Sequence, residues 1–428
     1  MKAQLRILMM IVPLAGCAVG PDYVRQDPAA PAHWSTTDDT RTESQQDISQ
    51  WWLRLNDPLL NELVATALRN SPDMRAARAR LQASRARLDL SDADFMPLLS
   101  GTLGANRSKT GSASPANQFN AGFDASWEID LFGGLRRASE AAEADAGATL
   151  ADLYHTQVSL AAEVALNYVQ LRSLQQRLAI ARNNLAAQRE TLKITEWRAQ
   201  AGLVTSMEVE QANSNLQQTL AGIPALSTSL VKAEHRLAVL LGQFPAALHD
   251  KLAAPAALPP LPEEIALGIP ADTLRQRPDV QAAERRVAAE TARIGQETAA
   301  RYPSFALSGS LGWKALTVGG LGDSANLTRS LSASLAQNIF DGGRLSSRVA
   351  AQDAVQQQTL IAYEQTVLLA LEEVENALAS YANSHARRAA LQDASASARN
   401  AALMARQRYE GGLIDFQSVL DTDRTLLS

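Results

Sequence analysis

A long stretch without proline, between Gly134 and Gly202, limits the folds open to this chain of 428 residues. About 67 residues rich in Ala, Leu, Gln, Glu and Arg separate these glycines, and a helix of that length would be roughly 100 Å long. Apolar residues recur at every seventh position of this stretch, which predicts coiled-coil packing and a left-handed supercoil. No compact domain needs such a helix, so we expect a function that involves crossing a distance. The recurring residues are Val164, Leu171, Leu178, Leu185 and Leu192.

The first residues predict export and a lipid anchor. A short basic start and an apolar segment at 7–14 are typical of a secretory signal. A Leu-Ala-Gly-Cys sequence follows and ends at Cys17, the single cysteine of the chain. We interpret it as a bacterial lipobox whose thiol receives diacylglycerol, because several acyl chains, at about 0.8 kcal/mol per buried CH₂, anchor a protein stably. Ala18 after the cysteine favours sorting to the outer membrane, whereas the alternative is a chance thiol beside an ordinary cleavage site.

Composition and motifs exclude several classes of function. The net charge of -5 argues against nucleic-acid binding, and no apolar run reaches the roughly 18 residues of a transmembrane helix. The five histidines are scattered, and the chain has no His-Glu-x-x-His, Walker, dinucleotide or Gly-x-Ser-x-Gly motif. Carboxylate pairs such as Glu372 and Glu373 fit a solvated helix face. We therefore expect no enzyme, no metal and no cofactor.

The chain repeats itself after about 200 residues. Arg-Pro-Asp at 277–279 stands where Ser-Pro-Asp stood at 71–73, an offset of 206, and Gly412 matches Gly202 at an offset of 210. The second copy lacks the counterpart of roughly 219–241, so we expect either a truncated fragment or a naturally short variant. Helices are predicted at about 58–68, 72–95, 134–201, 206–241 and 416–428. We divide the chain into a signal at 1–16, a lipidated tether at 17–56, a first repeat at 57–242, a Pro-rich linker at 243–270 and a second repeat at 271–428.

Each repeat contains two amphipathic strands, predicted at about 98–108 and 119–131, then 304–314 and 327–339. Such lengths are enough for the roughly 9–11 residues that a tilted strand needs to cross a bilayer, and one apolar and one polar face suit a membrane barrel. Four strands cannot close a barrel, so two chains would give eight strands and three would give twelve. The alternative is one face of a soluble sandwich. The candidates for membrane-interface aromatics are Trp127, Phe132, Tyr302, Trp313 and Phe340.

In combination, the motifs resemble the TolC-like outer membrane factors, specifically the lipoprotein (NodT/OprM-like) branch that serves tripartite efflux pumps. The resemblance covers essentially the whole chain. The segments that carry it are Leu-Ala-Gly-Cys-Ala-Val-Gly-Pro-Asp-Tyr at 14–23, Trp-Trp at 51–52 with Asn-Asp-Pro-Leu at 56–59, Trp-Glu-Ile-Asp-Leu-Phe-Gly at 127–133, Arg-Pro-Asp-Val at 277–280, Ile-Phe-Asp-Gly-Gly-Arg at 339–344 and Arg-Tyr-Glu-Gly-Gly-Leu-Ile at 408–414.

The resemblance implies a fold that is mainly α with a membrane β-barrel. It implies a homotrimer in the outer membrane of a Gram-negative bacterium, with a twelve-stranded barrel and a twelve-helix periplasmic tunnel. It also implies passive conduction, a periplasmic adaptor and an inner-membrane pump of RND type.

The resemblance further implies two groups of site residues. The turns of the helical hairpins would contact the adaptor, although their glycines also fit plain helix capping, and both roles can hold together. An acidic ring near the second turn would narrow the periplasmic mouth, although Asp421 also fits a cap or salt bridge within its own hairpin. The turn residues are Gly202, Leu203, Val204, Thr205, Gly411, Gly412, Leu413 and Ile414, and the aperture candidates are Asp415, Asp421 and Asp423.

Three other functions compete with an efflux duct. A duct for peptide or protein secretion has the same architecture and would differ in its operon neighbours. A structural coiled-coil lipoprotein would space the envelope layers without conducting, but a spacer needs no amphipathic strands. An envelope enzyme has no supporting motif.

Overall fold

A computed structural model describes residues 18–25, 30–35, 50–112, 114–260 and 270–427. The predicted signal at 1–16 and the lipobox residue Cys17 therefore lie outside the described residues. The chain forms two compact units, which we describe separately. Unit 1 takes its described residues from 1–29, 77–155 and 274–370, and unit 2 takes them from 30–76, 156–273 and 371–428. Each unit contains residues from both sequence repeats, so the two units do not coincide with the two repeats. The predicted repeat boundaries stay a prediction.

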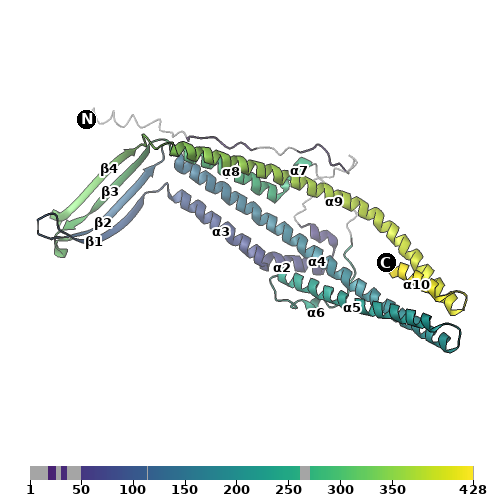
Figure 1. Cartoon of the computed structure of the whole chain (residues 1–428). Helices are drawn as coiled ribbons and strands as arrows, with labels where there is room; N and C mark the ends of the chain where they lie inside the picture. The colour runs from purple at the N-terminus through teal and green to yellow at the C-terminus, as the bar shows by residue number, and fades with distance from the viewer. Residues whose placement is uncertain (1–17, 26–29, 36–49, 113, 261–269, 428) are drawn as a thin grey trace. The chain divides into compact units, whose positions relative to one another are not determined.

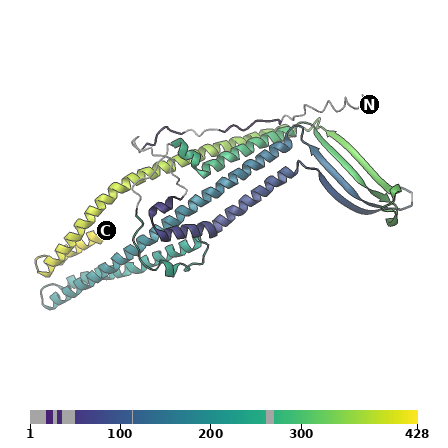
Figure 2. The same ribbon diagram turned by 180° about the vertical axis from the view of Figure 1, so that it is seen from behind.

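The described residues form long helices and four strands, labelled in Figure 1 and seen from behind in Figure 2. The long helices α4 and α9 each contain 67 residues, and the shorter α3 and α8 each contain 22. Equal lengths in corresponding places support the predicted duplication. In chain order the principal elements are η2 (Trp51–Leu55), α2 (Pro58–Asn70), α3 (Pro72–Ala93), β1 (Leu98–Ser108), β2 (Ala116–Ile129), α4 (Gly134–Gln200), α5 (Ser206–Leu240), α6 (His249–Leu252), α7 (Pro270–Gln276), α8 (Pro278–Ala299), β3 (Ser304–Ala315), η3 (Val318–Gly320), η4 (Ser324–Asn326), β4 (Leu327–Ala336), α9 (Arg344–Glu410) and α10 (Phe416–Leu427).

The four strands of unit 1 form one antiparallel sheet in the order β1-β2-β3-β4. Its register confirms the predicted alternation, because apolar residues align with apolar residues across the strands. One row joins Leu103, Ala121, Trp313 and Leu327, whereas a row on the other face, three register positions away, joins Ser100, Asp124, Ser310 and Ser330. Arg329 is an exception, since it pairs with Leu311 on the apolar face. The sheet therefore has one apolar and one polar face.

The strand ends differ slightly from those predicted, because pairing decides where a strand stops. β4 ends at Ala336 rather than at 339, since its partner β3 begins at Ser304, and these two residues form the last pair. β2 begins at Ala116 rather than at 119 because it pairs with β1 as far as Ser108. Similarly, α3 ends at Ala93, two residues before the predicted end.

Two glycines oppose each other at the centre of the sheet. Gly122 of β2 pairs with Gly312 of β3 on the polar face, and Thr102 and Thr328 flank them in the same row. A Cβ atom on either glycine would lie less than 3.0 Å from the backbone of the other. The close approach of β2 and β3 therefore requires glycine at both positions.

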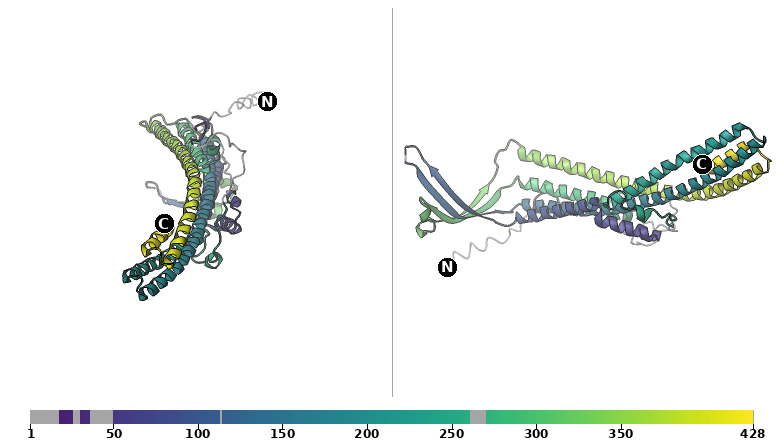
Figure 3. Two further views of the ribbon diagram at one scale, coloured as in Figure 1. Left: turned by 90° about the vertical axis from the view of Figure 1, so that its right-hand side faces the viewer. Right: turned by 90° about the horizontal axis from the view of Figure 1, so that it is seen from below.

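In unit 1, α8 lies between α4 and α9 (Figures 1 and 3). On one side Arg293 of α8 forms an ion pair with Asp145 of α4. On the other side the Gln352 side chain of α9 donates to Glu290 of α8 at 2.6 Å. Alanines supply much of the buried face of α8, which lets its neighbours approach closely.

In unit 2, four of the five residues of the predicted heptad seam of α4 are buried, and Leu192 is half-buried. Val164 and Leu171 are fully buried, and Leu178 and Leu185 nearly so. A polar network near the seam fixes α4 to segments distant in sequence: Tyr168 donates to the α2 cap Asp57 at 2.7 Å, and Arg172 donates to the backbone carbonyl of Ala254 at 2.8 Å. The α5 helix continues through Pro224. None of the helices in the described residues is long and apolar enough to cross a membrane.

Candidate docking turns, aperture and membrane face

The two hairpin turns of unit 2 have the same backbone geometry. Gly202 and Gly412 adopt left-handed φ angles of 71° and 74°. After α4, the Leu203 N–H donates to the carbonyl of Arg198 at 2.9 Å, and after α9 the Leu413 N–H donates to that of Arg408 at 2.9 Å. With the bonds of the preceding glycine N–H groups, this pattern is the Schellman motif, which satisfies the last carbonyls of a helix. The predicted capping role of both glycines is confirmed.

The same geometry places one leucine at the end of each hairpin. Leu203 is 68% exposed and Leu413 is 76% exposed, while the following residues Val204 and Ile414 are half-buried. Ile414 contacts a buried cluster beneath the second turn. Each turn therefore presents one exposed leucine, which we call the apolar knob, in front of a fixed backbone.

The two turns lie side by side in unit 2 (Figures 1 and 3), and contacts between α4 and α9 join them. The Arg198 guanidinium of α4 lies over the ring of Tyr409, 4.4 Å from its centroid, and donates to the Tyr409 carbonyl. The hydroxyl of Tyr409 shares a hydrogen bond of 3.2 Å with the buried Thr195. Tyr409 thus contacts α4 through its ring, hydroxyl and backbone, which holds the two hairpins together beside their turns.

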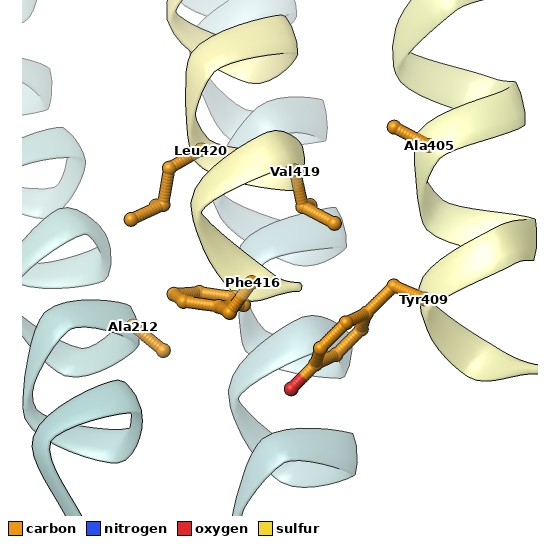
Figure 4. Close-up of a cluster of buried hydrophobic side chains, with 6 residues drawn as sticks. All are labelled: Ala212, Ala405, Tyr409, Phe416, Val419 and Leu420. Atoms are coloured by element: carbon orange, nitrogen blue, oxygen red, sulfur yellow. The ribbon is translucent and has the colours of Figure 1, made fainter. Parts of the chain in front are cut away.

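A buried cluster fixes α10 against its neighbours (Figure 4). Phe416, the first residue of α10, lies between Ala212 of α5 and the Tyr409 ring of α9, whose centroid is 5.5 Å away. Val419 and Leu420 extend this contact along the next turn of α10. The second hairpin is therefore anchored to the first by apolar packing as well as by Tyr409.

The three aspartates predicted near the aperture have different environments. Asp415 caps α10, because its carboxylate accepts from the N–H and hydroxyl of Ser418 at 3.0 and 2.6 Å. These hydrogen bonds hold the pKa of Asp415 below its usual value. Asp423 is buried and forms an ion pair of 2.9 Å with Arg406 of α9. Asp421 is exposed and accepts a hydrogen bond of 3.0 Å from Gln417 of its own helix. Asp421 is thus an accessible carboxylate that neither caps its helix nor joins the two arms of its hairpin.

Of the five predicted aromatics, Trp313 lies near one end of the sheet, and the other four lie at or just beyond the other end. Trp127 and Trp313 lie near opposite ends of the β2–β3 pair: Trp127 pairs with Leu307, six residues from Trp313 along β3, a separation of about 20 Å. At the same end as Trp127, Phe132 stacks on Tyr302 with ring centroids 4.8 Å apart. Phe340, which follows β4, is 92% exposed. This spacing is close to the roughly 25 Å apolar band between the aromatic girdles of membrane barrels.

Sequence reasoning missed the partners that hold the turns in place. Thr195, Arg198 and Arg406 were not predicted as site residues, and Tyr409 appeared only within the Arg-Tyr-Glu-Gly-Gly motif. Thr195 lies three residues after the seam position Leu192 and therefore on the same side of the helix, so the seam pattern could have indicated its burial. The ion pair of Arg406 with Asp423 depends on the packing of two helices and leaves no such signal.

Comparisons with known proteins agree with this architecture. A family model described as "Outer membrane efflux protein" matches residues 63–243 and 269–428. Nodulation protein T of Rhizobium leguminosarum bv. trifolii is 31% identical, over 96% of this chain and 89% of its own length. The probable outer membrane lipoprotein SilC of Salmonella typhimurium is 27% identical, over 100% of this chain and 93% of its own. The solved structure of the outer-membrane channel OprN is 38% identical, has a TM-score of 0.89, and matches 96% of this chain and 93% of that one.

Proposed function

Because this chain belongs to the outer membrane efflux protein family, we propose that its two leucine-bearing turns are the surface that the periplasmic adaptor contacts. The chain is the outer membrane channel of a tripartite efflux system. It works as a trimer with a periplasmic adaptor and an RND-type inner-membrane pump. Family members are channels, and we propose that this chain likewise acts by passive conduction, without catalysing a reaction.

One observation carries the docking proposal: both turns expose a leucine on the same glycine-fixed backbone. An apolar knob on a rigid support loses little conformational entropy when a partner covers it. Burying a leucine contributes roughly 1.5–3 kcal/mol, and a trimer would present the knob at each of its turns. An aspartate at this place would instead put an unpaired charge into the contact.

The test of docking is Leu413→Asp in full-length protein, expressed in a strain that lacks its own channel. We expect resistance to fall to that of the empty strain, while trimers still form and reach the outer membrane. Phe244→Asp is the matched control, because Phe244 is 88% exposed in the loop after α5, away from both turns. Unchanged resistance with Leu413→Asp, or an equal loss with Phe244→Asp, would contradict the proposal.

We also propose that Asp421 lines the periplasmic aperture. It is exposed, whereas Asp415 serves as a helix cap and Asp423 as an ion-pair partner. Three copies would form a ring of negative charge, which favours cations. In planar bilayers across a KCl gradient, Asp421→Asn should reduce cation selectivity more than Asp415→Asn does. The reverse order would assign the ring to Asp415 instead.

For Cys17 we propose lipidation, supported by the Leu-Ala-Gly-Cys sequence and by the similarity to SilC, a probable lipoprotein. Globomycin should block maturation, and Cys17→Ser should abolish incorporation of labelled palmitate. Palmitate labelling that persists in Cys17→Ser would refute the anchor.

We also propose that the aromatics at the two ends of the sheet lie at the two membrane interfaces, because of the spacing given above.

A further inference from the structure

The motif Ala-Val-Gly-Pro-Asp-Tyr at 18–23 has no part in docking, gating or conduction as described above. It lies in unit 1 against the turn after β2 and against α4 and α8. The Val19 N–H donates to the carbonyl of Phe132 at 3.1 Å, and the Val19 carbonyl accepts from Arg137 at 3.3 Å. Four residues further on, the hydroxyl of Tyr23 donates to Glu284 of α8 at 2.6 Å. We call residues 18–23 the clasp.

Glycines allow the clasp to lie directly on the body of unit 1. Gly20 has a φ of +96°, and a Cβ atom there would lie less than 3.0 Å from the Cα of Gly295. Under Ala18, a Cβ on Gly133 would likewise come within 3.0 Å of the Ala18 backbone. In both cases the neighbouring atom is backbone, which cannot move aside as a flexible side chain does. These two close contacts between backbones are therefore possible only because Gly20 and Gly133 have no side chain.

A buried arginine joins the clasp to α4. The Arg137 side chain is only 5% exposed and donates to Asp22 at 2.6 Å and to Glu140 at 2.7 Å. Gly295 makes room for it, since a Cβ there would lie 2.8 Å from the Arg137 side chain. Asp22 is 85% exposed, so water screens this pair and its contribution is small. The close contact of Gly20 and the bonds of Val19 and Tyr23 hold the clasp more firmly.

The hydrogen bond of Tyr23 also alters its ionisation. Burial raises the pKa of the Tyr23 hydroxyl, and donation to the Glu284 carboxylate raises it further. The phenol therefore remains a donor throughout the physiological range of pH. The Tyr23 hydroxyl therefore keeps its proton for the hydrogen bond to α8 over this range and does not act as a pH switch.

We propose that the clasp positions the lipid anchor, holding the N-terminus against the membrane-facing rim of the sheet. Phe132 lies at this rim, just after β2. Its carbonyl accepts a hydrogen bond from the Val19 N–H, and its ring stacks on Tyr302, which lies just before β3. Ala18 is the described residue nearest to the predicted lipidation site in sequence, and consecutive Cα atoms are about 3.8 Å apart. By this proposal, holding Ala18 at the rim would keep a lipid attached to the preceding residue close to the strands. This proposal rests on the proposed lipidation of Cys17.

The first experiment tests the clasp without the lipid. A cleavable signal of a non-lipidated protein replaces residues 1–17, which removes the only cysteine, and Val24→Cys carries a nitroxide spin label one residue after the clasp. In purified trimers we expect a motionally restricted spectrum, and Gly20→Val should give a several-fold faster motion. Asp22→Ala with Tyr23→Phe, which alters only the surface segment, should give a smaller increase. Gly111→Val is the control, because Gly111 has a φ of +57° but a Cβ there meets nothing within 4 Å.

The second experiment uses the natural lipidated chain. Gly20→Val should incorporate as much labelled palmitate as the parent but give several-fold fewer membrane-inserted trimers, while Gly111→Val leaves both quantities unchanged. A label at Val24 that stays restricted in Gly20→Val would refute the clasp. Released motion with normal insertion would refute its positioning role. If Cys17→Ser retains palmitate, the lipidation itself is wrong, and the spin-label result on the clasp still stands.

Discussion

The two hairpin turns have the same backbone geometry and differ in several of the side chains around it. Both end a helix with a left-handed glycine and expose the next leucine. At an offset of 210, however, the second turn has Tyr409 where the first has Ala199, and Phe416 where the first has Ser206. It also has Asp421 where the first has Gln211. Tyr409 and Phe416 thus pack the second turn against its neighbours, whereas the counterparts Ala199 and Ser206 have no aromatic ring for such packing at the first turn.

Backbone geometry fixes only part of a duplicated element. A helical hairpin needs a residue that tolerates positive φ, so glycine remains in both copies. The side chains around it can diverge, because each copy meets different neighbours. In this chain the second copy supplies most of the apolar cluster and the three aspartates, so we propose that it forms the aperture and that both copies take part in docking.

The largest expected effect separates Phe416 from its counterpart. Phe416→Ala should lower the local free energy of opening of the second hairpin by about 3–5 kcal/mol, the usual cost of truncating a buried phenylalanine. Ser206→Ala should change the first hairpin by no more than about 0.5 kcal/mol, because Ser206 is exposed. Hydrogen exchange of the backbone amides around each turn measures both quantities. Equal effects would mean that the cluster does not anchor the second turn.

The next effect concerns charge. Asp423→Ala should destabilise the second hairpin by about 2 kcal/mol, because it leaves Arg406 largely buried without its carboxylate. Its counterpart Asn213→Ala should be nearly neutral. Adding Arg406→Met to Asp423→Ala should restore part of the loss, which a double-mutant cycle by hydrogen exchange would reveal. Additive single effects would show that the pair contributes nothing.

The turns should respond alike when the shared backbone is altered. Gly202→Ala and Gly412→Ala should each cost about 1–2 kcal/mol, the price of a left-handed conformation for a residue with a Cβ. Steric effects should not separate them, since a Cβ meets nothing within 4 Å at Gly202 and only the Arg198 side chain at 3.7 Å at Gly412. Hydrogen exchange at the Leu203 and Leu413 amides would measure this. Clearly unequal losses would show that the two glycines have different roles.

The smallest effect distinguishes the two helix caps. Asp415 caps α10, whereas Thr205 makes no side-chain cap for α5, so only Asp415→Ala should reduce protection of its helix. Because the pKa of Asp415 is lowered in the folded chain, its stabilisation is present above the unfolded pKa of about 3.9 and is lost as pH falls through the folded value. Protection at the start of α10 should therefore decrease below about pH 4 in the parent and not in Asp415→Asn. The same decrease in Asp415→Asn would assign the titration to another group.

Regular periodicity was the part of the fold that the sequence could predict. The heptad seam of α4 and the alternation in the four strands repeat over enough residues to exceed chance, and the structure confirms both. Pro and Gly marked the ends of helices to within a few residues. Strand ends such as Ala336 were predicted less well, because a partner strand decides them.

The site was predictable only where the backbone alone determines it. The turn glycines were identified because positive φ leaves a trace in the residue type. The environments of Asp415, Asp421 and Asp423 could not be separated by sequence, since burial and ion pairing depend on how α9 and α10 pack. The role of Tyr409 between the two hairpins was hidden for the same reason.

The glycine pair at the centre of the sheet has a consequence for permeation. Gly122 and Gly312 leave two of the four positions in their polar row without side chains. In a trimeric barrel with its polar face inward, each of the three chains would contribute one such row of low relief, in which short threonines flank the two glycines. Solutes at that level would meet mostly backbone and water. We therefore expect these glycines to contribute little to any discrimination between solutes.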